Sequence, residues 1–78
     1  MKPFVIQQRT EHDIVIKSWE RISGDDARAV MLVHALDWVH RRINENVVVK
    51  AEFRKWAVDI VATAPNGVTE ITNFLVTQ

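Results

Sequence analysis

Apolar residues recur at helical spacing through three successive segments of the chain. The first segment predicts a helix over residues 11–22, where one helix face is formed at intervals of three, one, three and three residues by His12, Val15, Ile16, Trp19 and Ile22. The second segment predicts a helix from about residue 25 to Ile43, and the third predicts one within residues 47–64. Because short turns join the segments, the pattern predicts a small all-α bundle of three main antiparallel helices.

The second segment is the most apolar of the three. It carries two neighbouring stripes, one of Ala29, Leu32, Val33, Leu36, Val39 and Ile43 and one of Ala27, Met31, Ala35 and Trp38. A helix that is apolar over more than half of its circumference is normally covered on two sides. We therefore expect this helix to be central, with Trp19, Trp38 and Trp56 from the three segments meeting in a shared core.

The two ends of the chain are less regular. Residues 1–9 are expected to form an extended arm, and Pro65 with Asn66-Gly67 predicts a turn before a short C-terminal helix within residues 68–78. The alternative is an α+β fold, in which residues 4–6 pair with residues 13–16 as an N-terminal hairpin and two helices remain.

Composition places the chain among soluble globular domains. Its 78 residues fit a single domain, 1–78, with 47% apolar and 26% charged residues. Ten basic residues balance ten acidic ones, which argues against a general nucleic-acid binder, and the absence of cysteine excludes disulfides and thiolate metal sites. No apolar run is long enough for a secretory signal or a membrane span, so a cytoplasmic protein with no membrane association is expected.

The polar residues do not form a recognisable reaction centre. His12, His34 and His40 lack metal-ligand spacing, since His34 and His40 lie about 240° apart around a helix. His34, Asp37 and Arg41 share a helix stripe that could orient a general base, but an ion pair between Asp37 and Arg41 explains it more simply. No catalytic, cofactor-binding or metal site is predicted, and the protein is not expected to be an enzyme.

Basic residues around the second predicted turn are the candidate partner-binding site: Arg41, Arg42, Lys50, Arg54 and Lys55. We predict a small non-enzymatic interaction module that acts stoichiometrically on a protein partner as an adaptor, regulator or inhibitor. The apolar excess of the second helix is also compatible with a homodimer. A short, cysteine-free chain that starts with Met would suit a bacterial or phage accessory protein. The alternative is a DNA-binding regulator with a helix-turn-helix-like pair, in which residues 47–62 form the recognition helix.

Overall fold

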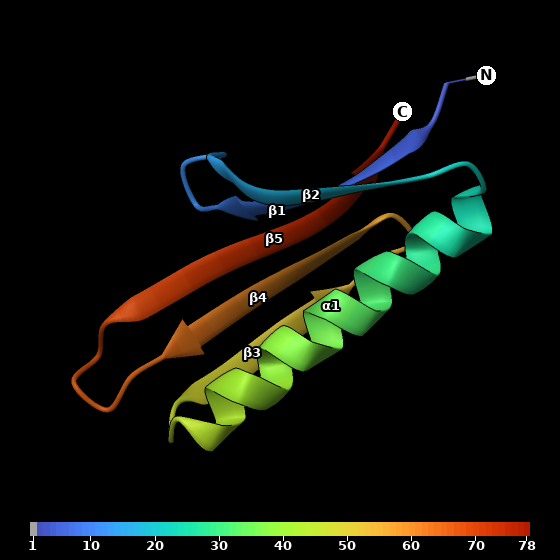
Figure 1. The fold of residues 1–78 in the computed structure, drawn as a ribbon. Helices are drawn as coiled ribbons and strands as arrows, with labels where there is room; N and C mark the ends of the chain where they lie inside the picture. Colours follow the sequence, from blue (N-terminus) through green and yellow to red (C-terminus); the bar gives the residue numbers. More distant parts are fainter. Residues whose placement is uncertain (1) are drawn as a thin grey trace.

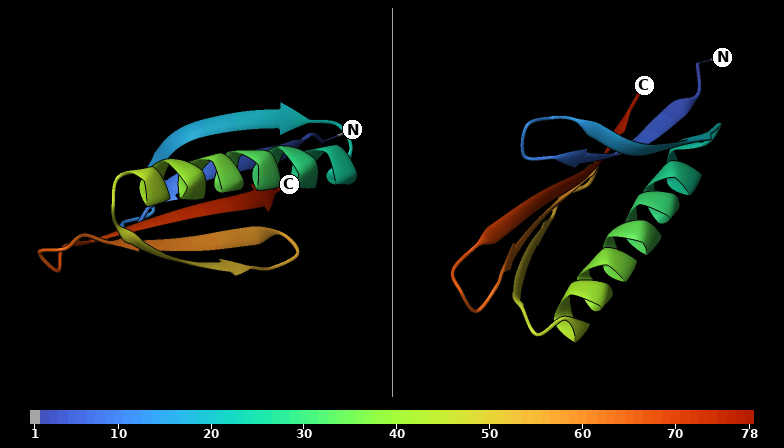
Figure 2. Two further views of the ribbon diagram at one scale, coloured as in Figure 1. Left: turned by 90° about the horizontal axis from the view of Figure 1, so that it is seen from below. Right: turned by 60° about the vertical axis from the view of Figure 1, so that its left-hand side comes forward.

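A computed structural model describes residues 2–78 as one antiparallel sheet with a single helix on one face (Figure 1). The sheet order is β2-β1-β5-β4-β3. The elements, in chain order, are β1 (Phe4–Thr10), β2 (Val15–Arg21), α1 (Gly24–Asn44), β3 (Val48–Phe53), β4 (Ala57–Thr63) and β5 (Thr69–Thr77). Figure 2 shows two layers, helix against sheet, and within residues 2–78 no element covers the opposite face of the sheet.

The prediction of an all-α helical bundle is wrong. Only the second predicted helix exists, as α1, while the segments predicted as the first, third and C-terminal helices are strands. The alternative α+β fold is closer, because β1 and β2 do pair as an N-terminal hairpin. Its pairing differs from the expected one, since residues 4–6 lie opposite residues 19–21 and not 13–16, and one helix remains instead of two. Residues 4–9 of the predicted arm belong to β1, which extends to Thr10, and Met1 lies outside the described residues.

The core follows the period of two that is typical of strands. In β4, Val58, Ile60 and Ala62 face α1 and are buried, while the intervening residues are only partly covered. Phe74 of β5 and Ile6 of β1 occupy the same helix-facing side of the sheet. From the helix, Ala27, Met31 and Ala35 complete this core. The four-residue spacing of these three helical residues forms one narrow contact line along α1.

The helix begins and ends with local features that its sequence supplies. Ser23 is the N-cap, and its hydroxyl accepts a hydrogen bond from the Asp26 backbone N–H at 3.3 Å. Asp25 and Asp26 lie in the first turn, where negative charge is favourable to the helix dipole. Gly24 allows a close approach, because a Cβ there would lie 3.3 Å from both Phe4 and Trp56.

The three tryptophans do not meet in a shared core. Trp19 lies on β2 and stacks on His34, whereas Trp38 lies on α1 and packs against Phe74 in a T-shaped arrangement. Trp56, in the turn between β3 and β4, is 38% exposed and stacks on Phe4. The three indoles therefore lie at separate places around the contact between α1 and the sheet. The centre of the core is aliphatic apart from Phe74.

Candidate functional site

The five basic residues predicted to bind a partner lie at separate places. Arg41 and Arg42 are in the last turn of α1, Lys50 is in β3, and Arg54 and Lys55 follow β3. The backbone carbonyl of Lys55 accepts a hydrogen bond from Arg28 near the other end of α1. Since α1 rises 1.5 Å per residue, Arg28 and Arg42 are about 21 Å apart. The structure therefore does not bring the five into one patch.

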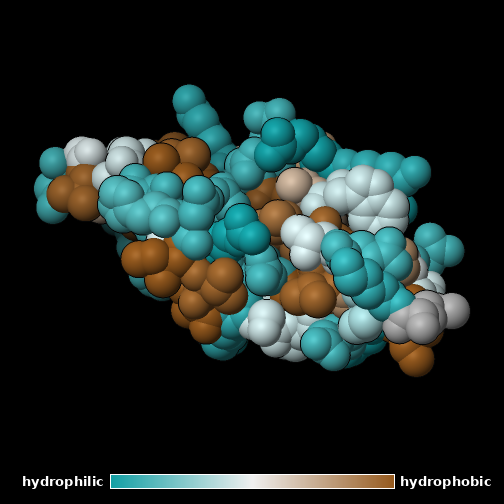
Figure 3. Space-filling model, turned by 90° about the horizontal axis from the view of Figure 1, so that it is seen from above, coloured by the Kyte–Doolittle hydropathy of each residue, from teal (hydrophilic) through white to brown (hydrophobic). Residues whose placement is uncertain are grey.

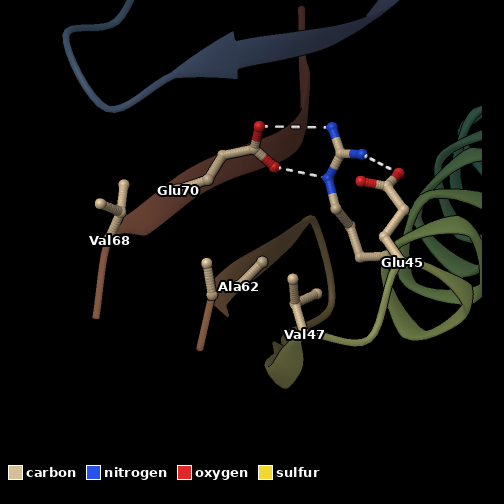
Figure 4. Close-up of a pocket in the computed structure, with 7 residues that line it drawn as sticks. Glu45, Val47, Ala62, Val68 and Glu70 are labelled. Carbon is tan, nitrogen blue, oxygen red and sulfur yellow. Dashed lines mark hydrogen bonds and ion pairs between the residues drawn. The ribbon is translucent and has the colours of Figure 1, made fainter. Parts of the chain in front are cut away.

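Arg42 is engaged within the protein (Figure 4). Its guanidinium donates to the Glu70 carboxylate at 2.7 and 3.3 Å and to Glu45 at 2.5 Å, and it lies 4.2 Å from the ring centre of Trp38. The hydrogen bond with Glu70 raises the pKa of Arg42 above its ordinary value. These contacts tie the end of α1 to β5, which gives Arg42 a structural role.

The remaining basic residues differ in how freely they could contact a partner. Arg41 forms an exposed ion pair with Asp37 at 3.0 Å, and Arg54 pairs with Asp59. The Lys55 ammonium lies 5.6 Å from the ring centre of Trp56. Lys50 has no ion-pair partner among residues 2–78.

The helix-turn-helix pair of the alternative DNA-binding prediction is not formed. The segment proposed as the recognition helix, residues 47–62, contains β3, a tight turn and most of β4. This segment therefore supplies no helix that could enter the major groove.

A small polar pocket lies between α1 and the strands β1, β2 and β5. It has a volume of about 180 Å³ and is lined by Gln8, Lys17, Trp19, His34, Asp37, Trp38, Arg41 and Phe74. Inside it, His34 is stacked on Trp19 with 4.1 Å between ring centres, while Asp37 pairs with Arg41. Among the hydrogen bonds of residues 2–78 there is none between Asp37 and His34, so the structure does not present the oriented general base considered above.

The outer side of α1 carries the largest continuous set of uncovered apolar side chains on this helix. We define the helix stripe as the apolar residues Ala29, Val33, Leu36 and Ile43 together with the polar His40, which lies among them. Val33, Leu36 and Ile43 are 64%, 56% and 57% exposed. These residues belong to the broad apolar circumference that predicted a helix covered on two sides, but the sheet covers only one. The broad apolar circumference of α1 was visible in the sequence, but the prediction that it is covered on two sides was wrong.

Other apolar residues reach the surface in more scattered positions. Ile14, Val15 and Ile16 are exposed around the start of β2, and Val68 is exposed in the turn before β5. On the face seen from above in Figure 3, apolar residues form separate patches between hydrophilic ones. The helix stripe differs from these patches because its members lie on one rigid element at regular spacing.

No protein-family model, curated protein or solved structure matches this chain. Within residues 2–78, no group of three or more His, Asp or Glu side chains is arranged to hold a metal ion. No helix in the described part of the chain combines the length and apolarity needed to cross a membrane. The surfaces themselves are therefore the basis for inferring a function.

Proposed function

We propose that the protein is a non-enzymatic module that docks on another protein through the helix stripe, acting stoichiometrically as an adaptor, regulator or inhibitor in the cytoplasm. The observation that carries this proposal is the exposure of Val33, Leu36 and Ile43 along one line of α1. More than half of each side chain faces water in the isolated chain. Burying such side chains against a partner is favourable by about 25 cal/mol per Å² of apolar surface.

The spacing of the stripe indicates the kind of partner surface. From Val33, the next members lie three, seven and ten residues along the helix, at Leu36, His40 and Ile43. This arrangement resembles the anchors by which an amphipathic helix occupies an apolar groove. The partner is therefore a protein with an elongated apolar groove.

Charged residues beside the stripe supply a polar rim. The exposed ion pair of Asp37 and Arg41 lies next to it on α1. Of the five basic residues predicted to bind a partner, Arg41 is the one placed to contact a protein seated on the stripe. Rim charges of this type contribute more to specificity and association rate than to affinity.

A pair of matched valine substitutions tests the proposal. Val33 in the stripe and Val68 in the β4–β5 turn are 64% and 63% exposed, so Val33→Glu and Val68→Glu make the same change at equal exposure. Neither substitution should disturb the core, and circular dichroism checks that both variants fold. Immobilised wild-type, Val33→Glu and Val68→Glu proteins are each incubated with lysate of the native host cells, and the retained proteins are quantified by mass spectrometry.

We expect at least one host protein to be retained equally by the wild-type and Val68→Glu proteins. Its retained amount should be lower by about tenfold or more on Val33→Glu, because burying a charge in an apolar groove is costly. Its purified form should then bind in a 1:1 ratio per chain by calorimetry. If no protein shows this pattern of retention, the stripe is not a docking surface and the proposal is wrong.

A further inference from the structure

The outer edge of β3 is open and complementary to itself. We propose that two copies of the protein pair through β3 as antiparallel strands centred on Ala51, which joins two five-stranded sheets into one continuous sheet. This inference does not depend on the helix stripe, because it rests on the sheet edge alone.

The backbone of β3 presents hydrogen-bonding groups at alternate residues. The Arg54 N–H donates to the Ala57 carbonyl at 2.8 Å, which fixes Arg54 as a residue that bonds toward β4. Because bonding directions alternate along an antiparallel strand, Lys50 and Glu52 also bond toward β4. The N–H and C=O groups of Val49, Ala51 and Phe53 therefore point outward from the sheet, and they have no backbone partner among residues 2–78.

A two-fold axis at Ala51 uses all of these groups. Ala51 faces Ala51 of the other copy, and Val49 faces Phe53 of the other copy on each side of the axis. Each of these pairs exchanges two hydrogen bonds, as in any antiparallel ladder. Phe53, 49% exposed in the single chain, gains an apolar cross-strand neighbour on the helix-facing side of the sheet.

The same register matches opposite charges. Lys50 lies directly opposite Glu52 of the other copy, twice by symmetry, on the face of the sheet away from α1. Within one chain, neither residue has an ion-pair partner among residues 2–78, and Glu52 lies directly across from Asp59. Like charges in that position are unfavourable, so the dimer supplies Glu52 with the cation that its own chain does not.

The neighbouring symmetric registers lack this match. A two-fold axis at residue 50 places Lys50 against Lys50, and an axis at residue 52 places Glu52 against Glu52. Both put like charges at the closely spaced pair on the axis. Charge therefore selects the register centred on Ala51 over a shift of one residue in either direction.

The other edge of the sheet is less suited to pairing. The register of β2 against β1 shifts between Gln8 and Arg9, which marks a bulge next to Lys17. Bulges and lysines on an edge are features that discourage strand addition. Pairing of β3 with β3 also closes after two copies, whereas pairing of β2 with β3 would continue into a filament.

Charge reversal tests both the dimer and its register. Lys50→Glu places two carboxylates opposite each other at both charged contacts, and Glu52→Lys places two ammonium groups there. The double variant Lys50→Glu, Glu52→Lys restores opposite charges with the net charge of the wild-type chain. Because both residues are exposed on the open face of an edge strand, the variants should fold, which circular dichroism checks. Dimer dissociation constants are measured by sedimentation equilibrium up to about 1 mM protein.

We expect a concentration-dependent wild-type dimer, about tenfold weaker association for each single variant, and wild-type association for the double variant. An equimolar mixture of the two single variants should form heterodimers more tightly than either forms homodimers, because in the mixed pair both contacts between positions 50 and 52 join opposite charges. A wild-type chain that stays monomeric at about 1 mM overturns the proposal. A dimer that is insensitive to both single variants, or not restored in the double variant, does so too. Val33→Glu leaves β3 unchanged, so loss of partner docking and loss of dimerisation are distinguishable.

Discussion

Gln8 places a side-chain amide inside the interface between the sheet and α1. The residue is 4% exposed, and its Nε2 has no hydrogen-bond partner among the atoms of residues 2–78. The indole N–H of Trp38, which lines the same polar pocket, is also unpartnered within the described chain. An unpaired buried donor costs about 1–3 kcal/mol, so these groups weaken an interface that is otherwise apolar.

Replacing the Gln8 amide should therefore stabilise the protein. Gln8→Met keeps the length of the side chain and removes the unpaired donor, and we expect the free energy of unfolding to rise by about 1 kcal/mol in urea titrations. Gln7→Met is the matched control, since Gln7 accepts a hydrogen bond from Arg9 at 2.9 Å and should not be stabilised by the same change. A loss of stability in Gln8→Met would show that the amide is hydrogen-bonded in solution.

At the scale of elements, the start of α1 depends on one side chain. The Ser23 hydroxyl caps the helix through the Asp26 N–H, while Ser18 lies exposed in β2 and caps nothing. We expect Ser23→Ala to lower the free energy of unfolding by about 1 kcal/mol and Ser18→Ala to change it by less than about 0.5 kcal/mol. Thermal and urea unfolding of the two variants measure the difference. Equal effects would mean that the cap contributes nothing specific.

The helix was predictable from sequence because its signals agree. Ser23 is a capping residue at its start, acidic residues follow, and the apolar pattern continues for more than five turns of helix. No run of residues with a strand period competes with it over that length. The observed end at Asn44 lies one residue beyond the predicted end at Ile43.

The strands were not predictable in the same way, because short apolar segments fit both the helical period and the strand period of two residues. In the third predicted helix, Val49, Phe53 and Ile60 match helical spacing, yet all three lie on the helix-facing side of two paired strands. The turn between these strands is Lys55-Trp56, which lacks the Gly, Asn or Asp that usually announces a hairpin. In β2, the bulge shifts the alternation of residues and removes its regular period of two.

At the scale of the whole molecule, the candidate surfaces depend on what the fold leaves uncovered. The sequence showed an excess of apolar residues in α1, but only the single sheet layer determines that Val33, Leu36 and Ile43 stay exposed. The edge position of β3 likewise follows from the order of all five strands. A pairing order between segments distant in sequence cannot be obtained from local periodicity, so the β3 edge could not have been predicted.

A dimer with a two-fold axis perpendicular to the sheet carries both helices on the same face. Each α1 keeps its own helix stripe, so the assembly presents two copies of the proposed docking surface to one side. A partner with two grooves would then bind with an effective concentration set by the dimer geometry. Dimerisation through β3 would therefore affect partner docking through the helix stripe, although the two proposals rest on different residues.

Amide hydrogen exchange can detect the assembled edge directly. In the single chain, the amides of Lys50 and Glu52 are bonded to β4, while those of Val49, Ala51 and Phe53 point to solvent. We expect the second group to become protected as protein concentration rises through the dimer dissociation constant, and the first group to be protected at all concentrations. The Lys50→Glu variant should keep the first protection and lose the second at equal concentration. A non-specific aggregate would slow exchange at surface amides on many elements, whereas an added strand protects the outward amides of β3. Protection that appears with rising concentration at Val49, Ala51 and Phe53, and not at exposed amides elsewhere, therefore indicates a strand added at this edge.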